Sequence, residues 1–200
     1  MKLIYKGKFK GVETLPKADL PENAVAFDEP KDPEGLVGSA IKYMLLAWGA
    51  VLLISLGALL LRGGVSSVFH WGAVIGFVAA FLTVIPHELL HGICFGRDAR
   101  VELYTDLRSG ILFVVSTQPV SKGRFIFLSL LPNLIFGWIP WILWLVLPLS
   151  PPFASALFSF SFVCIGFGAG DYLNVVNALR QMPRGSMQVL SGFNSYWYMP

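Results

Sequence analysis

Two histidines and a glutamate lie within five residues near the end of a long apolar stretch, at His87, Glu88 and His91. Side chains four positions apart on a helix project from the same face, so the two imidazoles can converge on one metal ion. A glutamate beside the first histidine is placed to activate a water molecule and later to pass its proton to a leaving amine. The spacing therefore predicts a Zn²⁺ site, with Glu88 as its catalytic base.

A catalytic zinc site usually has three protein ligands. The last apolar stretch contains a single acidic residue, Asp171. Counted from the expected outer ends of their helices, His87 and Asp171 lie at nearly the same depth, at about 1.5 Å per residue. A carboxylate at that depth needs a cation, so we expect Asp171 to be the third ligand. The alternative is a local polar network of Asp171 with Asn174 and Asn177.

Three further residues are candidates for supporting roles. Asn133, in the third apolar stretch, is expected to hydrogen-bond either a substrate or oxyanion, or a neighbouring helix. Asn174 lies one turn after Asp171, faces the same way and could orient that carboxylate. Cys94 lies one turn after His91 and can ligate a metal, but a packed thiol is the favoured interpretation.

Composition places these residues in a membrane protein. Hydrophobic residues make up 55% of the chain and charged residues 14%, against about 25% charged in a typical soluble domain. Four apolar segments, at about 41–61, 68–95, 125–147 and 153–179, are each long enough to cross a bilayer as a helix. We therefore expect an all-α polytopic membrane protein with four transmembrane helices.

The charged residues indicate how this chain is organised and oriented. We expect residues 1–40 to form a small, loop-rich N-terminal region, 41–182 the four-helix membrane domain and 183–200 a tail. Lysine and arginine concentrate in the 97–124 connection and near both ends, whereas the other two connections contain only Arg62. The positive-inside rule then predicts that both ends and the 97–124 loop are cytoplasmic. No basic face is clustered as in nucleic-acid-binding proteins.

The 97–124 loop has structure of its own. Residues 101–104 and 111–115 are strand-like runs, and the turn signal at 108–110 separates them. This pattern predicts a β-hairpin between the second and third helices. Residues 2–6 could also form a strand, although a loop-rich N-terminal cap is the expectation.

Several motifs resemble known families. The HELLHG run at 87–92, the Gly-x-Gly-Asp-x-x-Asn stretch at 168–174 and the tail motifs at 183–185 and 196–198 resemble a bacterial family of zincin peptidases, a domain of unknown function. The likeness covers most of the chain. The helix motif with a later membrane aspartate is also similar to the site-2 class of intramembrane metalloproteases. In that class the aspartate belongs to a longer motif ending Leu-Asp-Gly, whereas here Tyr172 and Leu173 follow Asp171.

Together these patterns predict a membrane-embedded zinc metalloprotease. It would hydrolyse a peptide bond of a membrane or membrane-proximal protein near the cytoplasmic face, with Zn²⁺ as cofactor. The alternative is a non-catalytic membrane scaffold or accessory protein with a structural zinc, which is usually closed by four protein ligands. A transporter is a further alternative, but four helices without an internal repeat disfavour it.

Overall fold

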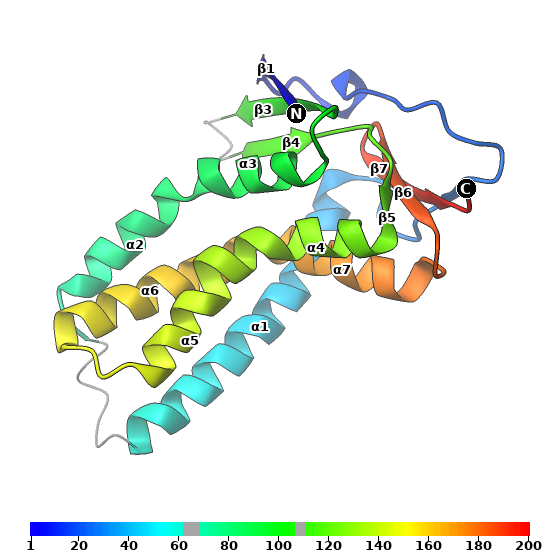
Figure 1. Cartoon of the computed structure of the whole chain (residues 1–200). Helices are drawn as coiled ribbons and strands as arrows, with labels where there is room; N and C mark the ends of the chain where they lie inside the picture. Colours follow the sequence, from blue (N-terminus) through cyan, green and yellow to red (C-terminus); the bar gives the residue numbers. More distant parts are fainter. Residues whose placement is uncertain (62–68, 107–110) are drawn as a thin grey trace.

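The computed structural model describes residues 1–61, 69–106 and 111–200. Figure 1 shows a group of inclined helices with two β-sheets and both marked chain ends gathered at one end of it. The helices are α1 (Pro33–Leu61), α2 (Gly72–Leu82), α3 (Val84–Cys94), α4 (Lys122–Asn133), α5 (Ile139–Val146), α6 (Pro151–Phe167) and α7 (Ala169–Gln181). A π-helical segment, Leu134–Trp138, joins α4 to α5, and a 3-10 turn lies at Val12–Thr14.

The two sheets combine strands that are far apart in the sequence. The first has the order β1 (Lys2–Lys8), β3 (Arg100–Asp106) and β4 (Ile111–Val115). In it β1 runs parallel to β3, and β3 runs antiparallel to β4. The second sheet has the order β2 (Val25–Ala26), β7 (Asn194–Tyr198), β6 (Met187–Ser191) and β5 (Val120–Ser121), with each neighbouring pair antiparallel.

The expectation of an all-α protein with four transmembrane helices is wrong. Two sheets are present, and among the described residues only two continuous helices are long and apolar enough to span a membrane: α1 and the helix Lys122–Val146. The other two apolar stretches are broken. The α2–α3 pair is bent by 40° and the α6–α7 pair by 52°, so the described residues contain two to four candidate spans.

The bend between α2 and α3 has a local cause. Proline has no N–H and its ring clashes with the carbonyl four residues earlier, which for Pro86 is that of Leu82. Helix α2 ends at Leu82, and the intervening Thr83 turns its hydroxyl back to the carbonyl of Ala80 at 2.7 Å. Helix α3 then begins at Val84, so the proline shifts the helix axis just before the histidine motif.

The predicted hairpin between the second and third apolar stretches is confirmed by the pairing of β3 with β4. Its turn signal at 108–110 lies outside the described residues. The expectation that the N-terminal region is loop-rich is wrong for residues 2–8, because these residues form β1 and add to the hairpin as a third strand. The C-terminal tail is also structured, since β6 and β7 form a hairpin that pairs with β5 and β2.

Close helix packing holds the apolar part together. A Cβ atom at Gly72 would lie 2.0 Å from the carbonyl oxygen of Pro152, and one at Gly76 would lie 2.0 Å from that of Ala156, so glycine lets α2 contact α6 directly. A core of buried aliphatic and tryptophan side chains fills the space between α1, α5 and α6. The outer faces of the helices are apolar too, as Leu53 and Leu82, each 74% exposed, illustrate.

Candidate metal centre

Helix α3 carries His87 and His91 on one buried face. Their rings lie 4.9 Å apart in an edge-to-face arrangement, and both side chains are almost inaccessible to solvent. The first helical bond of this turn runs from the His87 N–H to the carbonyl of Thr83, 2.7 Å away, directly after the bend. The helical spacing and the proline-induced bend together direct both imidazoles toward the first turn of α7.

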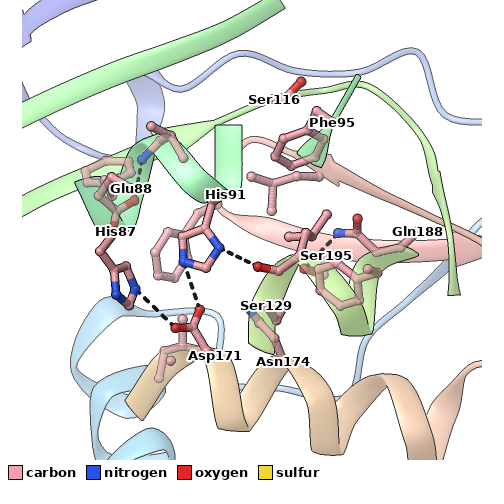
Figure 2. Close-up of a pocket in the computed structure, with 18 of the residues that line it drawn as sticks. His87, Glu88, His91, Phe95, Ser116, Ser129, Asp171, Asn174, Gln188 and Ser195 are labelled. Atoms are coloured by element: carbon pink, nitrogen blue, oxygen red, sulfur yellow. Dashed lines mark hydrogen bonds and ion pairs between the residues drawn. The ribbon is translucent and has the colours of Figure 1, made fainter. Parts of the chain in front are cut away.

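Asp171 lies in that first turn and meets both histidines (Figure 2). Its Oδ2 atom is 3.3 Å from Nε2 of His87, and its Oδ1 atom is 3.2 Å from Nε2 of His91. Asp171 is only 9% exposed, so its carboxylate contacts two imidazoles in place of solvent water. The structure therefore brings together the three residues that the sequence singled out as metal ligands.

A hydrogen bond at Nδ1, the ring nitrogen that faces away from Asp171, fixes the orientation of His91. Nδ1 lies 2.8 Å from the main-chain carbonyl oxygen of Leu128 in α4. A carbonyl only accepts hydrogen bonds, so Nδ1 carries the proton and the neutral ring keeps a lone pair on Nε2. Leu128 precedes Pro132 by four residues, and Pro132 cannot donate the helical hydrogen bond that this carbonyl would otherwise accept.

Asn133 lies behind Asp171 and is completely buried. Its side-chain Nδ2 donates to Asp171 Oδ2 over 2.8 Å. The Tyr172 hydroxyl lies 3.3 Å from Asn133 Oδ1 and 3.1 Å from the carbonyl of Ile165, so its single proton serves one of these acceptors at a time. Of the two roles open for Asn133, the structure supports a bond between helices, with the metal-facing carboxylate as its target.

Two weaker candidates were Asn174, as a residue that orients Asp171, and Cys94, as a ligand. Asn174 lines the cavity beside the histidines, while Asn133 makes the bond to Asp171 that was expected of Asn174. Cys94 packs against a core cluster around Phe125 and Leu128. Asn177 donates to Glu29 over 3.0 Å and so does not form the alternative polar network with Asp171.

A strand of the first sheet, β4, holds the carboxylate of Glu88 in place. The main-chain N–H of Val114 in β4 donates to Glu88 Oε2 over 3.0 Å, as the dashed line near Glu88 in Figure 2 shows. One ligand atom from each of His87, Glu88 and His91 lies within 4.8 Å of the others. Glu88 is thus near enough to serve either as a base beside the metal or as a further ligand.

A cavity of about 310 Å³ opens beside these groups. The helices provide the floor, and β4 and the β6–β7 hairpin contribute further walls through Val114, Gln188 and Ser195. Ser129 also lines it, and its buried hydroxyl has no hydrogen-bond partner among the described residues. Sequence reasoning missed Ser129, which carries no motif. The hairpin contains the tail motif at 196–198, but its position at the cavity depends on pairing that the motif does not reveal.

The donor set fits zinc. Two neutral imidazoles and one carboxylate are the ligand types that catalytic zinc sites use, and the tautomer of His91 leaves the metal-facing nitrogen unprotonated. The buried Asp171 carboxylate also needs a counter-charge, which a divalent cation held between it and the two imidazoles would supply.

Comparison with known proteins points the same way. A family model described as "putative zincin peptidase" matches residues 80–187, a stretch that contains both histidines, Glu88, Asn133 and Asp171. No curated protein and no solved structure gives a match.

Proposed function

Because the chain belongs to this zincin peptidase family, we propose that it is a membrane-embedded zinc metallopeptidase of the site-2 protease type. It hydrolyses a peptide bond of a membrane or membrane-proximal protein near the cytoplasmic face. The observation that carries the proposal is the approach of two imidazole Nε2 atoms to the Asp171 carboxylate, at 3.3 and 3.2 Å, with Glu88 beside them in a cavity.

His87, His91 and Asp171 would hold the metal. A bound Zn²⁺ supplies Lewis acidity that polarises the scissile carbonyl and eases the deprotonation of water. The chain prepares the ligands for it: the Leu128 carbonyl fixes the tautomer of His91, and Asn133 fixes the carboxylate of Asp171. Such supporting bonds orient ligands and commonly change metal affinity by 10- to 100-fold.

Glu88 takes a proton from the attacking water and delivers it to the leaving amine. The Val114 N–H holds Oε2, which leaves the second carboxylate oxygen as the proton acceptor. Because this hydrogen bond comes from β4, the sheet sets the position of the base relative to the histidines.

The outer edge of β4, which pairs with no further strand among the described residues, is a suitable place for an extended substrate. This strand is at the outside of its sheet, and the Val114 N–H points away from β3 toward Glu88. Main-chain groups of Leu112 face the same edge, since alternate residues of a strand present their hydrogen-bonding groups to the same side. A peptide that adds here as a strand passes close to the catalytic base.

Exposed apolar helix faces support the membrane location. The most apolar 18-residue window has a mean hydropathy of 2.4 in α1 and 1.8 in Lys122–Val146, and most of each window is not buried inside the protein. The bias of lysine and arginine toward the sheet end of the chain supports a cytoplasmic position for that end. Asp171, on α7, and the histidines, on α3, belong to the parts of the bent pairs nearer to this end.

The experiment compares Glu88→Gln with Asp171→Asn in purified protein and in cells. Glu88→Gln should keep about one zinc per chain while turnover falls by at least ~10²-fold, the usual scale for losing a general base. Asp171→Asn should lose zinc and activity together. Membrane proteins that accumulate in the Glu88→Gln strain identify the substrates.

The alternative function, a scaffold with structural zinc, predicts a different result. Structural sites are closed by four protein ligands, and Glu88 is near enough to be the fourth. In that case Glu88→Gln loses zinc and leaves no substrate to accumulate. Unchanged cellular function in a Glu88→Gln strain that retains its zinc would reject the peptidase.

A further inference from the structure

Glu29 is an acidic residue of the cavity that lies far from the metal-binding motif in sequence. It follows β2 and lies just before α1, and it lines the same cavity as His87, His91 and Asp171. Its Oε1 atom accepts from the main-chain N–H of Ser195 over 3.1 Å, and its Oε2 atom accepts from Asn177 Nδ2 over 3.0 Å. The side chain is therefore held in one place by β7 and α7.

The segment around Glu29 does not need this carboxylate for its position. The Phe27 N–H donates to the Ser195 carbonyl over 2.9 Å, and the Phe27 side chain is buried in a core cluster. The Asp28 N–H donates to Gln181 Oε1 over 2.7 Å, and Gln181 returns a bond to the Asp28 carbonyl over 3.3 Å. Main-chain bonds of Phe27 and Asp28 thus hold the segment against β7 and α7 without the Glu29 carboxylate.

Glu29 forms no ion pair within the described part of the chain, although Lys42 and Arg180 line a second pocket that Glu29 also borders. A carboxylate offers about four acceptor sites, and neutral amide donors occupy only two of them. None of the described residues that line the cavity is lysine or arginine. Burial raises the pKa of Glu29, while the bonds from Ser195 and Asn177 oppose that rise. A cation that enters the cavity and pairs with Glu29 would offset part of this cost.

The walls near this carboxylate suit a long cationic side chain. Five phenylalanines line the cavity: Phe95, Phe113, Phe125, Phe167 and Phe193. Lysine and arginine bury their methylene stems on such surfaces while the charged end reaches a polar partner. Asn177, which holds Glu29, follows Asp171 by six residues of helix, a rise of ~9 Å. This separation equals about two to three residues of extended chain.

We propose that Glu29 is the specificity determinant of this cavity and selects peptides that carry a lysine or arginine side chain within a few residues of the scissile bond. The inference rests on the proposed peptidase function and names its substrate class. Glu29 could also pair with the free α-ammonium group of a peptide N-terminus, because that group is a cation too. The test below therefore distinguishes it from a lysine or arginine side chain.

The test uses zinc-loaded, full-length protein in detergent and N-acetylated, C-amidated peptides that differ only in lysine or norleucine at successive positions. Wild-type protein should cleave the best lysine peptide with a kcat/KM at least ~10-fold above its norleucine counterpart. Glu29→Gln should reduce this ratio to about one. Asp28→Asn is the matched control, because it removes one negative charge from an exposed neighbour outside the cavity, and it should keep the ratio.

Two further arms separate the possible failures. Glu29→Asp retains the charge, so it should keep part of the preference if Glu29→Gln folds poorly. Equilibrium binding of the same peptides to Glu88→Gln should show the same preference without turnover. Zinc-loaded wild type that cleaves no peptide, while this binding preference persists, rejects the peptidase but not the subsite. Equal cleavage or binding of lysine and norleucine peptides, or a preference for free N-termini alone, rejects the subsite.

Discussion

The Nδ1–H of His91 donates to the carbonyl of Leu128, the residue whose helical partner position is occupied by Pro132. A proline inside α4 frees a carbonyl, and a residue of α3 uses it over 2.8 Å. The pair links a carbonyl left free by proline in one helix to the tautomer of a metal-facing imidazole in another.

Pro132→Ala should therefore weaken zinc binding by ~10-fold, the lower end of the usual range for lost supporting bonds. The new N–H at position 132 competes with His91 for the Leu128 carbonyl. Chelator competition measures the zinc dissociation constant. Pro140→Ala is the control, because Pro140 lies in the same long helix and its i−4 carbonyl belongs to Phe136. Equal affinity in the two variants would contradict the prediction.

Gly168→Ala should also lower zinc affinity, although the residue touches no ligand. A Cβ atom at this position would lie 2.1 Å from Asn133 Nδ2, so the amide must move away from Asp171. Asn133→Ala should give a similar loss, because both changes remove the same bond. Gly170→Ala is the control, since a Cβ atom there meets nothing within 4 Å. Zinc titration should give a lower affinity for Gly168→Ala and Asn133→Ala than for Gly170→Ala.

Ser129→Ala should separate activity from stability. The hydroxyl is buried without a described partner, so its removal should leave the melting temperature unchanged or raise it. If the hydroxyl donates to a bound peptide, kcat/KM should fall by about 10-fold at the same time. Ser161→Ala is the comparison: its hydroxyl bonds the Phe158 carbonyl over 3.0 Å and does not line the cavity. A fall in both properties for Ser129→Ala would indicate a structural hydroxyl.

Glu102 should make the first sheet sensitive to acid. Burial alone would raise its pKa, but the Tyr104 hydroxyl at 2.7 Å and the charges of Lys6 and Arg100 outweigh burial and hold the pKa below its ordinary value. The stabilisation is therefore present at neutral pH and is lost as pH falls through the lowered pKa. Glu102→Gln should cost ~1 kcal/mol at pH 7 and little in acid. Thermal unfolding across pH, with exposed Glu22→Gln as control, measures it.

Orientation can be tested by cysteine labelling after Cys94 and Cys164 are replaced by serine. Asp98→Cys, exposed near the sheet end, should react with an impermeant reagent only in inside-out vesicles. Trp71→Cys, at the opposite end and 64% exposed, should react only in right-side-out vesicles or intact cells. The reverse pattern would place the metal centre at the outer face.

The sequence predicted the parts of the centre that depend on local spacing. His87, Glu88 and His91 share one helical turn, and Asp171 was placed opposite them by depth along its own helix. The supporting bonds were harder to assign. Two of them come from main-chain groups of Leu128 and Val114, which any residue type could provide. Pro132 was the one available signal, because a proline within a helix implies a free carbonyl four residues before it.

The fold was predicted less well, for a related reason. Apolar length identifies a membrane-crossing segment but does not reveal where it bends. Pro86 marks the α2–α3 bend in the sequence, whereas the α6–α7 bend at Gly168 has no such proline and was expected within a single helix. The pairing of β1 with β3 joins segments about a hundred residues apart, as in the register Leu3↔Val101. Such pairing depends on which strand edges remain free after the helices pack, and local periodicity does not report this.

The β6–β7 hairpin gives the cavity its last wall, and this determines when the site can act during biosynthesis. All three candidate ligands are translated before Met187, so a nascent chain contains both histidines and Asp171 before that wall exists. Glu29, made early, has no bond from β7 until Ser195 has left the ribosome. The cavity is therefore complete only after the last strands have folded, and the proposed peptidase activity is expected only from that point.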